Sequence, residues 1–363
     1  MNKTVFLLPS LKISGGNRVI IEIANRLVNN NIQVDLIYPN NSNKISQTFF
    51  IDPKINLVSV GNHGNSKSKK LLNLLKVYFY INQNYKNENI IITDPIMSIF
   101  SPIIKNNKIF RYVQADDYVI FDDLYLLKSK FLLRIYKKLT KISYNYKNVT
   151  YIFNSKYTYD RFIQISKRRD VPLKLVHPAV NHKIFLNQKI RNPNEFNICI
   201  IARKHPLKGF KDFLKAYSDI KNKIDIDNVH ILSPDDLTEF NLEDAIIIKP
   251  KNDKEIAKYM NKSHVFISTS WREGFGLPPL EAMACGCAVI LTNAGGVNEY
   301  AKPNLNCLMF EPKNTQELKK HILYLYNNKE AIEKLSKEAE KNAKLFYWEK
   351  SAEQLIKILE FYK

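Results

Sequence analysis

The chain has 363 residues, of which 45% are hydrophobic and 25% are charged, and its formal net charge is +20. This length exceeds the size at which one hydrophobic core stops growing, so two domains are expected. No run of about 20 apolar residues occurs in the sequence, which argues against a membrane-spanning helix.

Short β-branched runs alternate with longer amphipathic stretches, a pattern typical of parallel β-α-β layers. The strands predicted in the first half are residues 4–8, 33–38, 57–60, 89–93, 109–113 and 150–153. The strands predicted in the second half are residues 196–202, 229–232, 245–248, 264–269, 288–291 and 307–310. Several are almost entirely apolar, as strands covered by helices on both faces should be. The predicted fold class is therefore α/β, with two doubly wound, Rossmann-like parallel sheets.

The domain boundary is expected within residues 174–185, which are followed by the polar run KIRNPNE. We therefore predict an N-terminal domain over residues 1–178 and a C-terminal domain over residues 179–345. Residues 346–363 place apolar side chains such as Trp348 and Leu355 at helical spacing, which predicts a terminal packing helix.

The first residues and the cysteines bear on cellular location. The start of the chain has only a superficial likeness to a signal peptide, because Pro9 interrupts the apolar run and Lys12 follows closely. A first β-strand is the better interpretation. The cysteines form no C-x-x-C pair and have no histidine partners at metal-ligand spacing. We therefore expect reduced thiols in a cytoplasmic protein at Cys199, Cys285, Cys287 and Cys307.

The first predicted strand leads to a glycine pair, Gly15 and Gly16, that opens an amphipathic helix. Adjacent glycines at a strand-to-helix turn let backbone amides approach a ligand at the positive end of the helix dipole. A phosphate or a sugar hydroxyl would fit there, although a tight turn without a ligand explains the glycines equally well. The pattern differs from the G-x-G-x-x-G of dinucleotide-dependent oxidoreductases.

A basic pair follows the strand predicted at residues 196–202. Arg203 ends this strand, and a four-residue loop leads to Lys208 and a glycine. Two cations at one strand end suit a diphosphate, because arginine offers a planar fork of donors and lysine a point charge. Two solvated surface cations are the alternative interpretation of this pair.

The most informative segment is REGFGLPPLEAMACG, residues 272–286. Gly274 and Gly276 free the backbone of a loop between a buried strand and a helix, and the two prolines suit the first turn of that helix. A strand, a glycine loop and a helix N-terminus at the carboxyl edge of a parallel sheet form an anion site. Glu281 in the helix suits a ribose diol, because one carboxylate accepts two hydroxyl hydrogen bonds.

Together these elements resemble the family 4 glycosyltransferases of the GT-B fold, a large retaining group that includes bacterial polysaccharide and lipid glycosyltransferases. Glu273 and Glu281 match the family's E-x7-E motif, and Arg203 with Lys208 matches its R-x4-K-G element. The resemblance covers nearly the full length. The further matching segments are Gly15-Gly16, Asn154-Ser155, residues 176–181, NAGGVNE at residues 293–299, and the terminal helix that Trp348 opens.

The resemblance implies two Rossmann-like domains that face a central cleft, with the C-terminal helix crossing back onto the first domain. It implies that Arg203 and Lys208 neutralise the diphosphate of a nucleotide-sugar donor. Glu281 would hold the ribose hydroxyls, and Glu273 would contact the transferred sugar. Glu273, Arg203 and Lys208 form the expected catalytic set. Other donor-binding residues implied in this way are Gly15, Gly16, Gly274, Phe275, Gly276 and Leu277.

One position departs from the family pattern. Many members have a donor-contacting histidine after the strand predicted at residues 109–113, whereas this chain has Gln114. Glutamine still hydrogen-bonds a hydroxyl but does not titrate near neutral pH, so the departure bears on the identity of the sugar more than on the activity. No metal or other cofactor is expected. The pairs Asp116-Asp117 and Asp122-Asp123 lack the D-x-D spacing of metal-dependent transferases and are interpreted as polar loop residues.

Positive charge is concentrated in the first half, where residues 1–178 hold 27 Lys and Arg against 11 Asp and Glu. Residues 124–147 contain no acidic residue and interleave cations with Leu, Ile, Phe and Tyr at roughly helical spacing; residues 67–76 are similar. A basic amphipathic helix suits an anionic membrane surface. The predicted membrane-docking residues are Lys128, Lys130, Arg134, Lys137, Lys138 and Lys141.

The basic charge also fits less specific interpretations. Residues 124–147 suit an ordinary helix with its apolar face inward and solvated lysines outward, and lysine is abundant in the chain as a whole. Nucleic-acid binding is disfavoured, because no nucleic-acid-binding motif occurs.

The combined expectation is a metal-independent glycosyltransferase on the inner face of the cytoplasmic membrane. It would move a sugar from a nucleotide-diphosphate donor to a glycan or lipid-linked acceptor, with retention, in the biosynthesis of a cell-surface polysaccharide such as lipopolysaccharide or capsule. A GT-B epimerase or phosphorylase is an alternative, as is a catalytically silent sugar-nucleotide-binding partner. The residues do not predict the donor base, the linkage or the oligomeric state.

Overall fold

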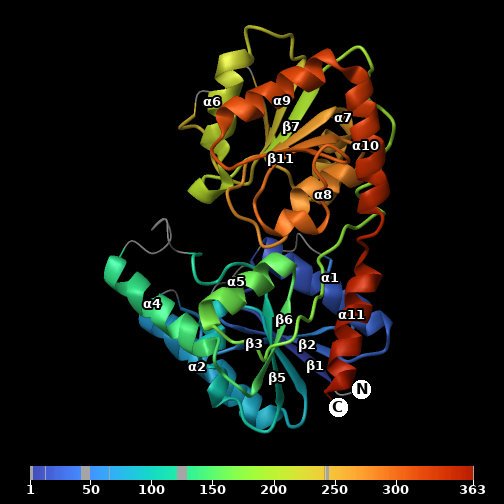
Figure 1. Cartoon of the computed structure of the whole chain (residues 1–363). Helices are drawn as coiled ribbons and strands as arrows, with labels where there is room; N and C mark the ends of the chain where they lie inside the picture. Colours follow the sequence, from blue (N-terminus) through green and yellow to red (C-terminus); the bar gives the residue numbers. More distant parts are fainter. Residues whose placement is uncertain are drawn as a thin grey trace. The chain divides into compact units, whose positions relative to one another are not determined.

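The computed structural model describes residues 3–12, 14–41, 50–64, 66–120, 129–240, 242 and 245–362. The chain divides into two compact units (Figure 1). The first unit combines Met1–Pro178 with Trp348–Lys363, and the second is Ala179–Tyr347.

The first unit contains a parallel sheet, whose strand order over the described residues is β3-β2-β1-β4-β5-β6. Its strands are β1 (Thr4–Leu7), β2 (Val34–Pro39), β3 (Asn56–Val60), β4 (Asn89–Ile92), β5 (Lys108–Val113) and β6 (Val149–Phe153). Its helices are α1 (Gly15–Asn29), α2 (Lys67–Asn84), α3 (Pro95–Ile99), α4 (Lys130–Ser143), α5 (Lys156–Ser166) and α11 (Trp348–Phe361), with the 3-10 turn η1 (Ser101–Ile103). Apolar side chains of the central strands pack with large aromatic residues, among them Tyr78, Tyr151 and Phe162, in one core.

The second unit contains another parallel sheet, with the strand order β12-β11-β10-β7-β8-β9 in the described part of the chain. Its strands are β7 (Asn197–Ile201), β8 (Asn228–Leu232), β9 (Ile246–Ile248), β10 (Val265–Ser268), β11 (Ala288–Thr292) and β12 (Leu308–Phe310). Its helices are α6 (Phe210–Ile220), α7 (Asp253–Lys262), α8 (Leu277–Ala284), α9 (Thr315–Asn327) and α10 (Lys329–Ala343), with the 3-10 turns η2 (Pro206–Lys208) and η3 (Gly296–Glu299). Its core includes Phe210 and Phe213 of α6 and Leu318 and Ile322 of α9.

The C-terminal helix α11 packs against α1 within the first unit (Figure 1). Trp348, Leu355 and Leu359 are buried on its inner face. The Ser351 hydroxyl donates a hydrogen bond to the carbonyl of His177 (2.5 Å). The helix therefore ties the end of the chain to the unit in which the chain begins.

The predicted α/β fold with two doubly wound parallel sheets is confirmed. Each predicted strand is present, with ends that differ by at most one residue. Every strand pairing that the structure describes is parallel. Sequence pattern was sufficient here because buried parallel strands are short apolar runs bounded by turn residues.

Within the described ranges, none of the helices combines the length and apolar character that crossing a bilayer requires. The four cysteines are buried and form no disulfide bond with one another. Burial raises the pKa of the Cys199 and Cys287 thiols above the usual value, which makes both poor nucleophiles.

Candidate active site

Three loops of the second unit meet at the carboxyl edge of its sheet. Strands β7, β10 and β11 lie side by side, and the loops after them contain residues 202–209, 269–276 and 293–296. Because parallel strands all end at the same edge, segments far apart in the sequence come together there. These loops carry Arg203, Lys208 and Glu273.

Lys208 and Glu273 form an ion pair, with 2.7 Å between Lys208 Nζ and Glu273 Oε1. The side chains are 37% and 17% exposed, so both remain accessible to a ligand. The loops that carry them also touch through the backbone, since the Trp271 amide donates to the Leu207 carbonyl (2.7 Å). Gly209 has a φ of +62°, and a Cβ there would lie 2.0 Å from the Thr269 carbonyl oxygen. The predicted Lys208-Gly209 element therefore needs its glycine for close approach.

Arg203 is anchored by a carboxylate that was not predicted from the sequence. Arg203 Nε donates to Asp235 Oδ2 (3.0 Å), and the Lys204 amide donates to the same oxygen (2.8 Å). Burial alone would raise the pKa of Asp235, but these two donors outweigh it and hold the pKa below the usual value. Asp235 follows β8, the neighbour of β7. Its position after a neighbouring strand of the same sheet was the signal that could have identified it.

The GFGLP loop is held by backbone contacts with the loop around Gly296. The Glu273 amide donates to the Ala294 carbonyl (2.7 Å), and the Gly296 amide donates to the Glu273 carbonyl (2.9 Å). A Cβ on Gly296 would lie 2.0 Å from the Gly274 carbonyl oxygen. The two loops therefore approach more closely than any residue with a side chain would allow.

Aromatic side chains pack against one another in this loop and beside it. The ring of Phe275 is buried and lies 5.5 Å from the ring of Tyr300 and 5.8 Å from that of Phe346. The Tyr300 hydroxyl donates to the Gly276 carbonyl (2.5 Å). Burial, and then the charge of Glu273, raises the pKa of Tyr300 well above its usual value, so the hydroxyl keeps its proton. The Phe275 side chain therefore packs inside the second unit.

Helix α8 begins in this loop and carries Glu281. Gly276, with a φ of +84°, occupies the N-cap position and has no side chain that could cap the helix. The next positions are Leu277, Pro278 and Pro279, and the two prolines have no backbone N–H. Of these three residues, Leu277 alone therefore has a backbone N–H that can donate a hydrogen bond. Glu281 is only 1% exposed, so it lies under the surface of the site.

In the first unit, Gly15, Gly16 and Gln114 come together. Helix α1 begins at Gly15, after an N-cap in which Ser14 Oγ accepts from the Asn17 amide (3.1 Å). Gln114 Nε2 lies 3.4 Å from the place that a Cβ on Gly16 would occupy, whereas nothing lies within 4 Å of a Cβ on Gly15. The Asn154 side chain donates to the Gln114 carbonyl (2.8 Å). A Cβ on Gly16 would thus be in van der Waals contact with Gln114, whereas Gly15 faces open space.

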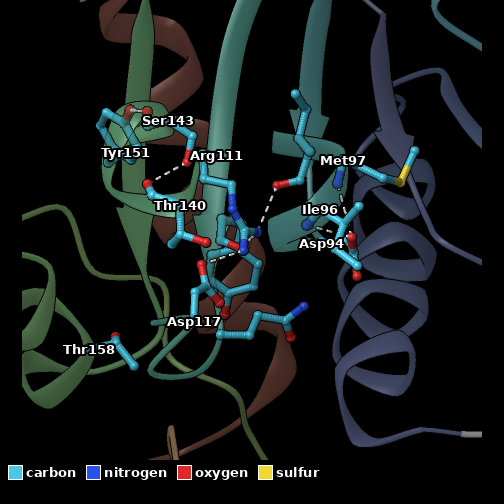
Figure 2. Close-up of polar contacts among 12 residues, drawn as sticks. Asp94, Ile96, Met97, Arg111, Asp117, Thr140, Ser143, Tyr151 and Thr158 are labelled. Atoms are coloured by element: carbon cyan, nitrogen blue, oxygen red, sulfur yellow. Dashed lines mark hydrogen bonds and ion pairs between the residues drawn. The ribbon is translucent and has the colours of Figure 1, made fainter. Parts of the chain in front are cut away.

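Asp116 and Asp117 lie in the loop after β5, as the interpretation as polar loop residues expects, but both also form ion pairs that the sequence did not predict. Asp116 is paired with Arg161 (2.5 Å), and Asp117 is paired with the buried Arg111 (2.7 Å). Figure 2 shows the Arg111 side chain extending to Asp117. Both aspartates are buried. Their partners come from other elements, which spacing alone does not reveal. Asp122 and Asp123 lie outside the described residues.

Acidic side chains near Arg111 accept hydrogen bonds from donors of the protein itself. Asp94 Oδ1, for example, accepts from the amides of Ile96 (2.9 Å) and Met97 (3.0 Å) and caps helix α3 (Figure 2). The described residues include no group of three or more His, Cys, Asp or Glu side chains arranged to hold a metal ion.

Helix α4 carries five of the six predicted membrane-docking cations; Lys128 lies outside the described residues. Its buried face consists of Tyr136, Thr140 and Ser143. Five of its apolar side chains are instead exposed, by 36 to 69%, and are Phe131, Leu132, Ile135, Leu139 and Ile142. The alternative of an ordinary helix with its apolar face inward was therefore wrong.

Known proteins resemble this chain in both sequence and fold. Residues 182–344 match the family model described as glycosyl transferases group 1. An uncharacterized glycosyltransferase of Methanocaldococcus jannaschii is 28% identical over 209 residues, which cover 57% of this chain and 58% of that protein. The D-inositol 3-phosphate glycosyltransferase of Paenarthrobacter aurescens is 27% identical over 50% of this chain and 48% of its own length. The chain thus spans about half the length of these two relatives.

Solved structures match over nearly the full length. Sucrose-phosphate synthase from Thermosynechococcus elongatus has a TM-score of 0.84 at 16% identity, over 100% of this chain and 99% of that one. The Anabaena protein HepE, in complex with UDP and glucose, has a TM-score of 0.77 at 18% identity, over 99% and 100% of the two chains. The chain therefore has the GT-B fold, and its second unit, over residues 182–344, matches the glycosyl transferases group 1.

Proposed function

We propose that this protein is a glycosyltransferase that moves a sugar from a nucleotide-diphosphate donor to a glycan or lipid-linked acceptor. The observation that carries the proposal is the meeting of Lys208, Glu273 and Arg203 at one edge of the second sheet. This set offers two cations for a diphosphate and a carboxylate for sugar hydroxyls. The family match over the same unit supports the assignment.

The Lys208–Glu273 pair suits a ligand that has both phosphates and hydroxyls. In the free protein the two charges neutralise each other across 2.7 Å. A bound nucleotide sugar would replace that pair with two complementary contacts, phosphate to Lys208 and hydroxyl to Glu273. As the bond between sugar and phosphate breaks, negative charge grows on the diphosphate, and Lys208 with Arg203 would stabilise it. A ligand with phosphate alone would leave Glu273 facing negative charge.

Glu281 and the first-unit residues would complete recognition of the donor. Glu281 is buried and would accept hydrogen bonds from the two ribose hydroxyls. Gln114, beside Gly16, would contact the transferred sugar. The Gly15 amide would face the ligand at the N-terminus of α1. Transfer with retention, without a divalent metal, is the reaction that the resemblance to family 4 favours.

Relatives support a polysaccharide or lipid-linked acceptor. Matched proteins include a serotype-specific mannosyltransferase, WbdA, of Escherichia coli, and the structure of WaaG, a glycosyltransferase involved in lipopolysaccharide biosynthesis. We propose that this chain also acts in the biosynthesis of a cell-surface polysaccharide.

The direct test combines binding and product analysis. Thermal-shift measurements with UDP, GDP and their sugar conjugates should identify a donor that raises the melting temperature. Product analysis with that donor, with and without an acceptor and in excess EDTA, should then show an acceptor-dependent glycoside of retained configuration. A changed sugar nucleotide without an acceptor would indicate an epimerase, and release of a sugar phosphate a phosphorylase. Binding without any turnover would indicate a silent partner.

We further propose that α4 docks the protein on an anionic membrane surface at the inner face of the cytoplasmic membrane. The exposed apolar residues of α4 occupy one face of the helix, and the cations Lys130, Arg134, Lys138 and Lys141 lie beside it. Such a helix lies in the interface with its apolar stripe inserted and its cations near the headgroups. Each cation near the surface contributes about 1 kcal/mol.

Vesicle flotation tests the docking. The protein should float with vesicles that contain phosphatidylglycerol and not with phosphatidylcholine alone. The double variant Lys138→Glu/Lys141→Glu should lose flotation, as should Phe131→Ser/Ile135→Ser. The matched control is Lys334→Glu/Lys337→Glu on α10, which changes the net charge equally. Equal loss in that control would show that net charge, rather than α4, governs binding.

A further inference from the structure

Gln114 stands at the start of a short segment that is anchored at each end. Residues 114–117 follow β5 directly. At the first residue, the Asn154 side chain donates to the Gln114 carbonyl (2.8 Å). At the last, the Tyr136 hydroxyl donates to the Asp117 carbonyl (2.6 Å). The backbone on both sides of the segment is therefore fixed by side chains from the end of β6 and from α4.

The two aspartates at the end of this segment bind different elements. Asp116 Oδ2 accepts from Arg161 Nε of helix α5 (2.5 Å). Asp117 Oδ2 accepts from Arg111 NH2 of strand β5 (2.7 Å). Arg111 is itself tied to the sheet, because its NH1 donates to the carbonyls of Ile92 (3.2 Å) and Tyr112 (2.6 Å). Adjacent residues thus connect the segment to helix α5 and to strand β5.

Stability alone does not explain these charges. Arg111 and Asp117 are 1% and 3% exposed, and replacing such a buried pair with apolar residues of similar volume is often neutral or stabilising. In the described part of the chain, Arg111 Nε and Asp116 Oδ1 are buried without a hydrogen-bond partner. The pairs are therefore incompletely satisfied, and directional anchoring of the segment is what they supply.

Directional anchoring matters for glutamine in particular. The two ends of its amide differ, since the oxygen only accepts and the nitrogen only donates. A glutamine distinguishes one hydroxyl orientation from another only if its backbone and amide are held in one arrangement. Gln114 Nε2 is already packed close to Gly16, so a small shift of the segment would change which atoms face the ligand.

We propose that the consecutive ion pairs Asp116–Arg161 and Asp117–Arg111 position Gln114 for recognition of the transferred sugar. This inference rests on the proposed function. Asp116 and Asp117 are positioning residues, which act through Gln114 and do not touch the ligand. They determine which sugar is preferred, while the affinity for the nucleoside diphosphate is set in the second unit.

The test uses the Asp116–Arg161 pair, because removal of Asp117 would strand a buried arginine and endanger folding. Asp116→Ala leaves Arg161, which is 28% exposed, free to reach solvent. Calorimetry gives two dissociation constants for each variant, one for UDP or GDP alone and one for its sugar conjugate. In Asp116→Ala the contribution of the sugar, measured as the ratio of the two constants, should fall about tenfold, because the loss of one hydrogen bond has an effect of about this size. The constant for the nucleoside diphosphate should stay within about twofold.

Two further variants separate positioning from stability. Asp116→Glu keeps the charge and should recover part of the ratio. Asp160→Asn is the matched control, since it removes the exposed Lys156–Asp160 pair of the same helix α5 and should change neither constant. The proposal is overturned if Asp116→Ala lowers only the melting temperature, or if Asp160→Asn changes the ratio equally. Equal affinity of the wild-type chain for both ligands would also overturn it.

Transfer by the wild-type chain is measured separately. Absence of transfer with every donor and acceptor would contradict the proposed function, whereas the two dissociation constants would still decide the role of the segment.

Discussion

The loops that carry the candidate site residues are held differently in the two units. In the second unit, the loops after β7, β10 and β11 touch through backbone atoms, at Gly209 and Gly296, where no side chain fits. In the first unit, residues 114–117 are held by side chains, through Asp116 and Asp117. Backbone packing at these glycines fixes main-chain groups and leaves no room for a side chain, whereas the ion pairs fix side chains that come from different elements. Under the proposed function, the backbone-packed loops would hold the diphosphate, and the ion-paired segment would bear on the choice of sugar.

The largest effect is expected from a side chain placed between the second-unit loops. In Gly296→Ala the Cβ would lie 2.0 Å from the Gly274 carbonyl oxygen, so the backbone must move. We expect a loss of about 2–3 kcal/mol in the free energy of unfolding, as for overpacking elsewhere, together with loss of donor binding. Urea unfolding gives the first value. Gly15→Ala is the control, because its Cβ meets nothing within 4 Å; equal unfolding curves for the two variants would contradict the comparison.

The second prediction concerns the positive charge of Lys208 in the second unit. Lys208→Ala should lower kcat about 100-fold or more, as loss of one preorganised electrostatic group does elsewhere, and leave the fold intact. The neighbouring Lys211→Ala, exposed on α6, should behave as wild type. Initial rates with the identified donor provide the measurement. Near-normal turnover in Lys208→Ala would contradict the assignment of the diphosphate site to this loop.

Replacement of Gln114 in the first unit should lower activity less than replacement of Lys208. Gln114→Ala should lower kcat/KM for the preferred donor about tenfold and reduce its preference over a donor that differs in one hydroxyl. Competition between UDP-glucose and UDP-galactose, or GDP-mannose and GDP-glucose, measures the preference. Gln83→Ala, on the exposed part of α2, is the control. If Gln114→Ala slows both donors equally, the segment does not select the sugar.

The smallest effect concerns Asp235, a side-chain anchor within the second unit. Its pKa is lowered in the folded protein, so its contribution to stability is present above the unfolded pKa of about 3.9. That contribution is lost as the pH falls through the lower folded value. Asp235→Asn should therefore melt below wild type at about pH 6, and the difference should shrink toward about pH 3. A difference that is constant with pH would mean that the charge of Asp235 does not matter.

Much of the second-unit site was predictable from the sequence. The strands are short apolar runs, and glycines and prolines mark the loops between them. The E-x7-E and R-x4-K-G spacings place Glu273, Glu281, Arg203 and Lys208 at strand ends that a parallel sheet must bring together. Asp235 was missed, although it follows the neighbouring strand β8, because the adjacent aspartates Asp235 and Asp236 in a polar loop carry no distinctive spacing.

Only the tertiary structure decided two other features. The amphipathic pattern of residues 130–143 identifies a helix, but it does not say which face packs inward, and in α4 the apolar face is the exposed one. Likewise, Asp116 and Arg161 are 45 positions apart, and their pairing depends on where α5 lies against the end of β5. Local periodicity specifies strands, helices and glycine turns by itself, because these depend on neighbours in the sequence. The partners of charged and apolar side chains depend on packing across elements, which no local pattern records.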